Sequence, residues 1–535
     1  MTATPPPSPK DVIVVGAGFA GLYLLYRLRE MGLSAQALEA GDDVGGTWYW
    51  NRYPGARCDV PSLQYSYSFS KELQQEWTWS EKYATQPEIL DYIRHVADRF
   101  DLRGMIRFET RVVSAVFDEA TSLWHVTTDQ GEVLKAHYCI MATGSLSASR
   151  LPDIEGIESF AGRTLHTGRW PHEGVDFTGR RVGVIGTGSS AVQAIPKIAE
   201  QAAQLTVFQR TPNFTVPARN EVLPDEEVAA WKANYDQHRA KARDTRSAML
   251  YDYGTRSALE VPEAERRAEM ERRWAAGGTN FLYAFNDVMR DEASNQVVAD
   301  FIREKIVETV QDAETARKLM PRDYPVGAKR ICVDTDYYDT YNRPNVGLAD
   351  LREEPIIRIT PTAVITSQGE YPIDDLVLAT GFDAMTGALS AIDIRGRYGE
   401  RLREKWAAGP RTYMGLMTAG FPNLFIVNGP GSPSVLSNMV ASVEQNVDWI
   451  MDCITAVGIE GSIEADRSAE DAWVEHVNEV AAPTLYGKAA SWYMGANVPG
   501  KPRVFMPYVG GWSNYAAKTA EVAAKGYEGF HVRRA

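Results

Sequence analysis

The sequence predicts an α/β protein with two Rossmann-like dinucleotide-binding domains and a mostly helical insert. Three observations lead to this prediction. One glycine-rich fingerprint lies near the start of the chain, Gly16-Ala17-Gly18-Phe19-Ala20-Gly21. A second lies further along, Gly186-Thr187-Gly188-Ser189-Ser190-Ala191. The segment between about 221 and 319 is rich in Ala, Arg, Glu and Lys, of which Ala, Glu and Arg are good helix formers.

The first fingerprint stands between a strand and a helix. Residues 12–15 are a β-branched run typical of a buried parallel strand, and residues 22–29 predict a helix. Residues 35–38 predict the next strand, which ends at Glu39, close to the spacing expected for an acid that binds a ribose hydroxyl. The pattern predicts an adenine dinucleotide with its pyrophosphate at the helix N-terminus, and does not separate FAD from NAD. The aromatic residues of 45–55 could flank a flat ring system or serve only in packing.

The second fingerprint differs from the first at the end of its following strand. Residues 182–185 and 205–208 predict two strands, and a helix should start at Ser189, with Pro196 ending or kinking it. Arg210 and Thr211 follow the second strand in place of an acid. An acid there would repel a 2′-phosphate, whereas arginine can bind it through charge-assisted hydrogen bonds worth about 1.5–3 kcal/mol each. The sequence therefore favours NADPH over NADH.

Two strands that end at glycines mark where the chain leaves one nucleotide domain and returns to it. Residues 138–141 precede Gly144, and residues 376–378 precede Gly381. We therefore expect one domain to be inserted in the other, with the boundaries 8–145 and 382–535, then 146–220 and 326–381, and a helical insert at 221–325. Four aromatic residues of the insert region are expected in the core rather than at a ligand: Trp231, Tyr235, Trp274 and Tyr283.

Composition limits the classes of partner. The chain has 535 residues, 44% of them hydrophobic, and a formal net charge of −14, which argues against general binding to nucleic acid or anionic membranes. No Cys-x-x-Cys pair occurs among the four cysteines, so neither a redox dithiol nor a zinc knuckle is expected. We expect reduced thiols, no metal, a cytoplasmic location and a monomer or weak homo-oligomer. The proline-rich residues 1–10 are expected to fray.

A third motif lies just before the second fingerprint. Its fixed positions fit the pattern Phe-x-Gly-x-x-x-His-x-x-x-Trp-Pro and are filled by Phe160, Gly162, His166, Trp170 and Pro171. With the two flanking fingerprints, this motif makes the chain resemble the type I, class B flavin Baeyer–Villiger monooxygenases, nearest to the branch acting on aryl, steroid and cyclic ketones. The resemblance runs from about residue 11 to residue 515. His172 departs from it, since Asp or Gly is more usual there.

The resemblance implies an activity. Enzymes of this family bind FAD tightly, reduce it with NADPH, add O2 at flavin C4a and use the resulting peroxyflavin to convert ketones to esters or lactones. The oxidised NADP+ stays bound. An N- or S-oxygenating flavin monooxygenase is the alternative, against which Trp170 and Pro171 argue. A flavin disulfide reductase would need a cysteine pair, and a non-enzymatic flavoprotein would need no arginine beside the flavin.

The resemblance also assigns residues. Arg330 matches the catalytic arginine and Asp59 the acid that positions it, while Lys329 joins Arg210 and Thr211 at the 2′-phosphate. Trp492 matches a tryptophan near the nicotinamide on a mobile loop. Residues 430–439 match a loop beside flavin and substrate, where Ser434, Val435 and Leu436 either tune substrate size or are plain loop. His166 is expected to act at the domain linker rather than as a base, with Trp170 packed in the same linker. Further FAD contacts are implied at Ala20, Thr47, Trp48, Asp59, Tyr65, Val112 and Met439.

Overall fold

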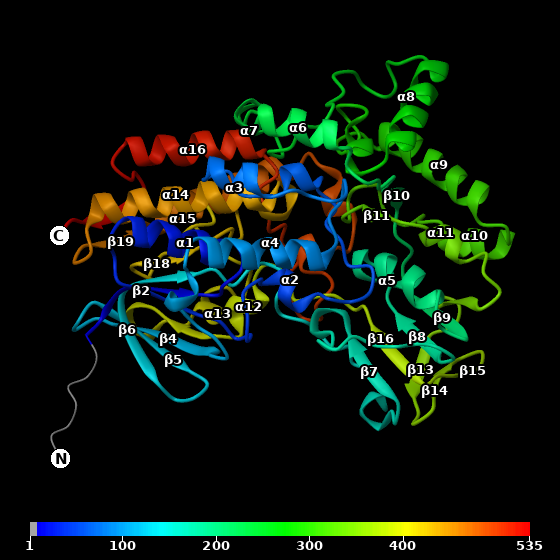
Figure 1. Cartoon of the computed structure of the whole chain (residues 1–535), viewed down its shortest axis with the longest axis horizontal. Helices are drawn as coiled ribbons and strands as arrows, with labels where there is room; N and C mark the ends of the chain where they lie inside the picture. The colour runs from blue at the N-terminus through cyan, green and yellow to red at the C-terminus, as the bar shows by residue number, and fades with distance from the viewer. Residues whose placement is uncertain (1–7) are drawn as a thin grey trace.

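The computed structural model describes residues 8–535 and contains two main sheets that lie side by side, the larger at the left of Figure 1 and the smaller at the right. Most of the residues expected to fray, 1–7, lie outside the described part, and Lys10 already belongs to the first strand. The predicted α/β class with two Rossmann-like sheets and a helical insert is confirmed.

The larger sheet has the order β17-β4-β5-β6-β1-β2-β3, with β18 also paired to β6. Strands β1, β2, β3, β6 and β18 run parallel, whereas β5 pairs antiparallel with both β4 and β6. Its strands are β1 (Lys10–Val15), β2 (Ala35–Leu38), β3 (Ile106–Arg107), β4 (Val112–Asp118), β5 (Leu123–Thr128), β6 (Val133–Met141), β17 (Asp393–Arg395) and β18 (Leu424–Ile426).

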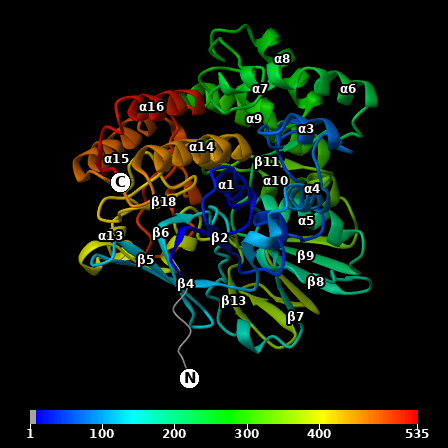
Figure 2. The same ribbon diagram turned by 60° about the vertical axis from the view of Figure 1, so that its left-hand side comes forward.

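Helices cover the larger sheet in two layers. In Figure 2, α1 lies next to the strands, with α14 packed on it and α16 further out. The core between them is built from apolar residues such as Leu24, Tyr138 and Ile450. The helices of this part are α1 (Phe19–Glu30), α2 (Thr47–Trp50), α3 (Lys71–Glu76), α4 (Gln86–Arg99), α12 (Gly387–Ser390), α13 (Leu402–Lys405), α14 (Met439–Val457), α15 (Arg467–Ala481) and α16 (Trp512–Ala524).

The smaller sheet is entirely parallel in the order β12-β9-β8-β16-β7. Its strands are β7 (Arg163–His166), β8 (Arg181–Ile185), β9 (Gln204–Gln209), β12 (Val346–Asp350) and β16 (Asp375–Leu378), and a hairpin sheet of β13 (Ile356–Ile359), β14 (Ala363–Thr366) and β15 (Glu370–Pro372) lies beside it. Helix α5 (Ser189–Ala199) runs through Pro196 and ends three residues after it, so the expected limit holds without a break at the proline itself. The residues around Pro196 are buried, and their packing outweighs the lost backbone hydrogen bond.

The insert is helical, as predicted, and runs along the top and down the right side of Figure 1. It contains α6 (Asp225–Ala233), α7 (Tyr235–Arg243), α8 (Glu263–Ala276), α9 (Glu292–Thr309) and α10 (Ala313–Leu319). Its two ends meet where β10 (Thr215–Pro217) pairs in parallel with β11 (Cys332–Asp334), which is followed by α11 (Tyr337–Thr340). The remaining small sheet pairs β19 (Ser462–Ala465) with β20 (Phe530–Arg533).

Two chain segments join the larger and smaller sheets and run together. Ser149 bridges Phe382 in an antiparallel pair, and the amide of Asp383 donates to the carbonyl of Ala148 at 2.9 Å. The expected departure and return of the chain therefore lie side by side, between residues 142–150 and 379–383.

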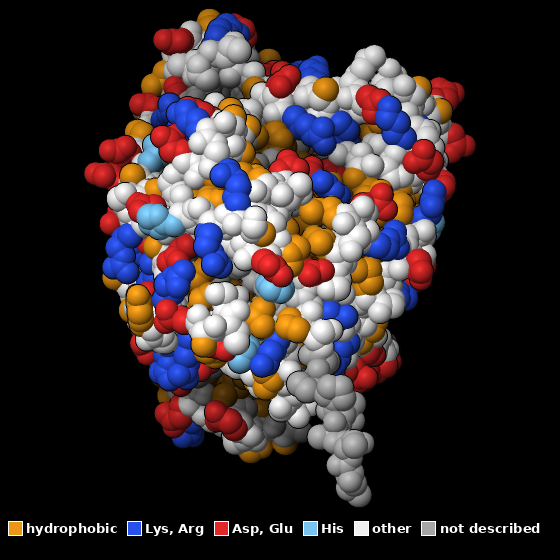
Figure 3. Space-filling view, turned by 90° about the vertical axis from the view of Figure 1, so that its left-hand side faces the viewer, with side chains coloured by type: hydrophobic (Ala, Val, Ile, Leu, Met, Phe, Trp, Pro, Cys, Tyr) orange, Lys and Arg blue, Asp and Glu red, His pale blue; other side chains and the backbone are white. Residues whose placement is uncertain are grey.

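Side chains of both charges lie on the surface, whereas the cysteines lie inside the protein. On the face drawn in Figure 3, acidic and basic side chains are mixed, with apolar side chains between them. Within residues 8–535, no helix is both long and apolar enough to cross a bilayer. The four cysteines, Cys58, Cys139, Cys332 and Cys453, are buried and not in disulfides.

Candidate active site

The first fingerprint forms a tight strand–turn–helix junction. A Cβ added to Gly21 would stand 2.0 Å from the carbonyl oxygen of Gly16, so only glycine fits at this crossing. Helix α1 starts after Gly18 with neither a side-chain cap nor an acid in its first turn, which leaves its positive end open to a pyrophosphate. Glu39 is buried at the end of β2 and accepts from the amides of Ala17 and Gly41 at 2.8 Å each, and burial raises its pKa.

The remaining expected FAD contacts surround this junction. Trp48 is buried, and its indole nitrogen donates to the hydroxyl of Tyr65 at 3.2 Å. Thr47 opens α2 and is exposed, whereas Ala20 in α1 and Met439 at the start of α14 are half-buried. Val112 opens β4 and is buried. The glycine junction, the open helix end and the buried acid fit the pyrophosphate and ribose of an adenine dinucleotide.

The second fingerprint repeats the junction at β8 and α5. Helix α5 starts after Gly188 without a side-chain cap, and Ser189, Ser190 and Ala191 form its first turn. A Cβ added to Gly188 would meet no protein atom within 4 Å, so the space before this residue is open to a phosphate. The hydroxyl of Thr187 donates to the carbonyl of Thr211 at 2.7 Å and ties the turn to the end of β9.

Basic side chains meet at the far end of this second site. Arg210 is exposed just beyond β9, and Lys329 lies close enough for the two charges to interact. Burial and the neighbouring charge of Arg210 lower the pKa of Lys329 to about 8. Its ammonium lies 4.6 Å from the ring centre of Tyr324. Two adjacent cations at the end of the strand suit a dianionic phosphate.

Arg330 and Asp59 form a two-pronged ion pair between segments far apart in the chain. The Nε of Arg330 donates to Oδ2 of Asp59 at 2.9 Å, and its Nη2 donates to Oδ1 at 2.8 Å. The Arg330 side chain retains 31% of its exposure and that of Asp59 21%, so the pair is partly accessible from the adjoining space. The guanidinium is thus fixed in orientation while part of it remains exposed.

Two further groups hold the other side of Arg330. Its Nη1 donates to the carbonyl of Val435 at 2.8 Å, and the hydroxyl of Tyr493 lies near enough to its guanidinium to affect its pKa. Burial alone would lower the pKa of Arg330, but the charge of Asp59 and the contact with Tyr493 outweigh it and raise the pKa further. Arg330 therefore stays positively charged throughout the accessible pH range.

The segment that carries Asp59 is anchored on the second nucleotide unit. The hydroxyl of Tyr53 donates to Oε1 of Gln193 in α5 at 2.8 Å, and Nε2 of Gln193 donates to the carbonyl of Arg57 at 3.0 Å. A Cβ added to Gly55 would stand 2.4 Å from the carbonyl oxygen of Gln193. The position of Asp59 thus depends on how the two nucleotide units fit together.

His166 ends β7, and both of its ring nitrogens are engaged in the linker. Nδ1 accepts from the amide of Gly168 at 3.0 Å, so Nε2 carries the proton that it shares with the carbonyl of Arg150 at 3.1 Å. Burial lowers the pKa of His166, which keeps the ring neutral. The buried Trp170 follows in the same segment and packs near Phe177. Neither ring nitrogen of His166 is left free to act as a base.

Tyr493 lies in one apolar cluster with Trp492 and with residues of the loop 430–439. The rings of Trp492 and Tyr493 have centres 4.3 Å apart within the short helix η9 (Trp492–Met494), and Val435 belongs to the same apolar cluster as Tyr493. Ser434 has a left-handed backbone with φ of 42°, which turns the loop so that the Val435 carbonyl reaches Arg330. The loop is therefore joined to the arginine through its backbone.

Sequence reasoning missed Tyr493 and the carbonyl of Val435 as partners of Arg330. The sequence signal for Tyr493 is that it follows Trp492, to which the resemblance assigns a role. A backbone carbonyl gives no signal in the sequence. Tyr283, expected as a core residue, is half-buried, and burial raises its pKa while the charge of Arg330 acts to lower it. Tyr283 thus lies close to the site.

Comparisons with known proteins agree with this geometry. Residues 13–243 match the family described as pyridine nucleotide-disulphide oxidoreductase. The chain is 45% identical over 526 residues to a phenazine N-monooxygenase of Lysobacter antibioticus, covering 97% of this chain and 96% of the relative. It is 43% identical over 524 residues to a Baeyer-Villiger monooxygenase of Pseudooceanicola batsensis, covering 97% and 95%. A solved structure of an oxidized steroid monooxygenase bound to NADP has a TM-score of 0.94 and 52% identity, covering 99% of this chain and all of that one.

Proposed function

The chain belongs to the Baeyer–Villiger monooxygenases, and from this premise we propose that Arg330, held by Asp59, binds the ketone oxygen during the reaction. The observation that carries the proposal is the two-pronged ion pair, which fixes a permanent cation and leaves it 31% exposed. A cation fixed in this way is ready to stabilise negative charge on a neighbouring oxygen.

The protein is a flavoprotein monooxygenase that binds FAD, takes electrons from NADPH and converts ketones to esters or lactones with O2. Bound FAD supplies the activated oxygen atom that is inserted between the carbonyl carbon and a neighbouring carbon. In the net change one carbon–carbon bond breaks and two carbon–oxygen bonds form, and the second atom of O2 leaves as water.

Arg330 has five N–H groups, and its carboxylate and carbonyl partners occupy three of them. One N–H on each Nη is left. We assign one of these two to the ketone oxygen, whose negative charge grows as its carbon is attacked. One such donor contributes about 2.7–4 kcal/mol, or about a hundred- to a thousand-fold in rate. Asp59 acts as a positioning residue.

We assign FAD to the domain of residues 8–145 and 382–535, and NADPH to that of 146–220 and 326–381, with 221–325 as the insert. The pairing of strands within each sheet supports this division. At the first site the pyrophosphate would lie at the start of α1 and the ribose against Glu39. At the second, Arg210, Thr211 and Lys329 would hold the 2′-phosphate, with Trp492 beside the nicotinamide.

The finer assignments follow from the relatives. Since a solved structure with 52% identity is named a steroid monooxygenase, we propose bulky cyclic or aryl ketones as substrates, with Ser434, Val435 and Leu436 setting the size limit. We propose a cytoplasmic monomer or weak homo-oligomer. One relative is named a phenazine N-monooxygenase, so oxygenation of nitrogen is the second candidate activity to be tested.

The direct test is product analysis by gas chromatography and mass spectrometry with the purified yellow protein, NADPH and O2. The panel contains cyclohexanone, an aryl acetone, a large-ring ketone and a steroid ketone, with a sulfide and an aromatic amine as controls. We expect ester or lactone in step with NADPH consumption. Sulfoxide or N-oxide without any ester would instead favour the second candidate.

A further inference from the structure

Arg246 lies in the segment between α7 and α8, and its side chain has no partner. The residue is exposed, and within residues 8–535 its guanidinium takes part in no ion pair and no hydrogen bond. Asp244, two positions before it, forms no ion pair with it, and Asp252 is paired with Arg272 at 2.8 Å. The reaction described above assigns no role to this charge.

The backbone at Arg246 is fixed against two helices of the larger domain. Its carbonyl accepts from the amide of Trp512, the first residue of α16, at 2.7 Å. The carbonyl of Ser247 accepts at 2.8 Å from the amide of Asn438, which caps α14. Asn438 belongs to the loop whose backbone also contacts Arg330. Arg246 is therefore attached next to the loop that borders the reaction site.

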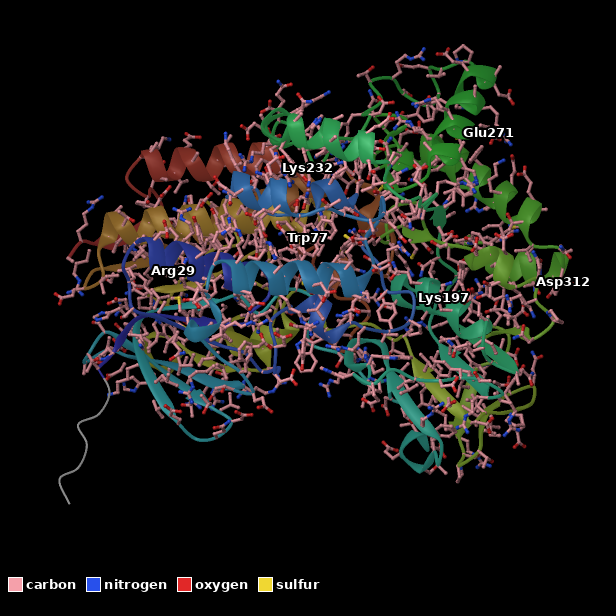
Figure 4. The ribbon with its side chains drawn as sticks, viewed as in Figure 1. Arg29, Trp77, Lys197, Lys232, Glu271 and Asp312 are labelled. Atoms are coloured by element: carbon pink, nitrogen blue, oxygen red, sulfur yellow. The ribbon has the colours of Figure 1, made fainter. Side chains whose placement is uncertain are left out.

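The helices before this segment are also attached to the larger domain. Lys232, labelled in Figure 4, lies at the end of α6 and donates to the carbonyl of Gln75 at 2.7 Å and to the hydroxyl of Thr78 at 3.0 Å. In α7, Nη1 of Arg239 donates to the carbonyl of Gln64 at 2.8 Å. These contacts hold α6 and α7 in place, so the segment that follows them starts from a fixed point.

Arg246 and Arg330 both lie close to Tyr283. The guanidinium carbon of Arg246 stands 5.9 Å from the centre of the Tyr283 ring. This ring is half-buried, and its neighbours Tyr251 and Tyr253 have ring centres 5.3 and 4.9 Å away from it. Burial raises the pKa of Tyr283, and the charges of Arg246 and Arg330 both act to lower it. The phenol of Tyr283 is therefore near both guanidinium groups.

Tyr486 lies near the same two cations. It belongs to the short helix η8 (Leu485–Lys488), far along the chain from the insert. Burial raises its pKa, and the charges of Arg246 and Arg330 again act to lower it. Its ring centre is 5.6 Å from that of Tyr493, the neighbour of Arg330. Phenols from two separate segments of the chain are thus near both cations, which indicates that Arg246 and Arg330 belong to one site.

The two cations differ in their charge balance. Asp59 compensates Arg330 through two hydrogen bonds of 2.9 and 2.8 Å. In the described part of the chain, no acid lies within ion-pair distance of Arg246. Arginine keeps its charge throughout the accessible pH range, and its N–H groups match the geometry of a carboxylate. Arg246 therefore places an uncompensated positive charge beside the reaction site.

We propose that Arg246 is a specificity-determining residue that favours ketones carrying a carboxylate. The proposal rests on the function proposed above: the ketone oxygen binds at Arg330, and Arg246 binds the anionic group at the other end of the same molecule. The rings of Tyr283 and Tyr486 contact the apolar part between them. Because Arg246 is exposed, we expect a moderate contribution of about three- to ten-fold in kcat/KM.

The test compares charged ketones with their uncharged amides in the holoenzyme with NADPH and O2. One pair is 4-(2-oxopropyl)benzoate and 4-(2-oxopropyl)benzamide, and the other is 4-oxocyclohexanecarboxylate and its amide, which has a different spacing. The quantity measured is the kcat/KM of ester or lactone formation for the acid, divided by that for the amide. In Arg246→Gln we expect this ratio to fall about three- to ten-fold in at least one pair.

Three further variants separate charge from shape. Arg246→Lys should keep most of the wild-type ratio, because it keeps the charge. Arg246→Glu should lower the ratio further than Arg246→Gln, because it repels a carboxylate, and high ionic strength should reduce both effects. Arg243→Gln is the matched control, since this arginine at the end of α7 has a 51% exposed side chain, and it should leave the ratio unchanged.

The proposal is wrong if the wild type, Arg246→Gln and Arg246→Glu show the same ratio for both pairs. A purely structural arginine would give that result, because its loss would slow the acid and the amide equally. A higher KM for NADPH in Arg246→Gln, with an unchanged ratio, would place Arg246 at the cofactor instead. Ester formation from the amides shows that the proposed function holds even if Arg246 fails this test, whereas no ester from any of the four ketones would contradict both proposals.

Discussion

Arg330 illustrates how much one residue depends on partners that the chain brings from far away. Asp59 lies 271 positions before it and Val435 105 positions after it. No periodicity or spacing in the sequence predicts contacts between residues so far apart. Only the family resemblance indicated Arg330 and Asp59. The Val435 carbonyl and Tyr493 required the structure, because hydrogen bonds from backbone groups and between distant side chains leave no trace in the sequence.

Replacing Asp59 tests whether the charge of the carboxylate positions the arginine. Asp59→Asn keeps the shape but removes the charge that two donors of Arg330 share. Since a charged hydrogen bond contributes about 1.5–3 kcal/mol, ester formation should fall about ten- to a hundred-fold, with NADPH-driven bleaching of the yellow colour nearly unchanged. Stopped-flow absorbance follows the bleaching, and product analysis measures the ester. Asp91→Asn, which changes a side chain that is 63% exposed, is the control. An unchanged ester yield in Asp59→Asn would show that Asp59 does not position Arg330.

Lys329 predicts a pH dependence for NADPH binding. Its pKa is lowered to about 8, so the free protein loses this charge as the pH rises above 8. A 2′-phosphate binds the charged form, and the KM for NADPH should therefore rise above pH 8, by up to about ten-fold per unit. The KM for NADH should stay flat, and Lys329→Arg should remove the rise, because a guanidinium remains charged. Parallel pH profiles for NADPH and NADH would contradict this assignment.

At the scale of elements, the sequence located most of the secondary structure around the two fingerprints. Strands β2, β8 and β9 begin and end within one residue of the predicted ranges, and β1 begins two residues before its range. In β1 and β8 the β-branched residues and the glycines that follow them are local signals, so local reasoning is enough there. Helix α5 begins at the predicted Ser189 and ends three residues after Pro196, and burial of Ile195 and Ile198 on both sides of the proline keeps the helix intact through it.

Strand β11 carries a buried acid that should make stability depend on pH. Burial raises the pKa of Asp334 to about 6, although its hydrogen bond with Thr215 acts the other way. The folded state then keeps a proton that the unfolded state loses near pH 4. The free energy of unfolding should fall as the pH rises from about 4 to about 6, by roughly 3 kcal/mol in total, and stay level above that.

Asp334→Asn isolates this contribution. The amide cannot ionise, so the difference in melting temperature between variant and wild type should change between pH 4.5 and 6.5 in favour of the variant. Asp323→Asn, at a 66% exposed side chain, should show no such change. A pH-independent difference for Asp334→Asn would mean that the carboxyl titrates normally in the folded protein.

In the whole molecule, the reaction site depends on two nucleotide units that are joined by two connecting segments of the chain. The segment that carries Asp59 is hydrogen-bonded to Gln193 of the second unit. His166 is hydrogen-bonded to both Gly168 and Arg150 in the linker. Sequence reasoning predicted that one domain is inserted in the other and that His166 belongs to the linker. It could not predict how the units face each other, because that depends on surface shape over the whole contact.

The linker role of His166 makes a prediction of its own. His166→Ala removes two hydrogen bonds from a buried position, so the melting temperature should fall by several degrees and ester formation should decrease. The KM for NADPH should change less than three-fold, since His166 lies outside the phosphate site. Arg169→Ala, at an exposed position three residues on, should resemble the wild type. If His166 were a general base, its removal would abolish the rise in activity on the acid side of the pH profile, without any loss of melting temperature.

We propose that Arg330 serves the ketone oxygen and not the delivery of electrons. Arg330→Ala separates these two roles when its half-reactions are compared: bleaching of the yellow colour by NADPH under anaerobic conditions, and ester formed per NADPH consumed in air with a ketone that the wild type converts. We expect bleaching within a few-fold of the wild-type rate, ester yield reduced at least a hundred-fold, and hydrogen peroxide in its place. Ester formed in step with NADPH by Arg330→Ala would contradict it.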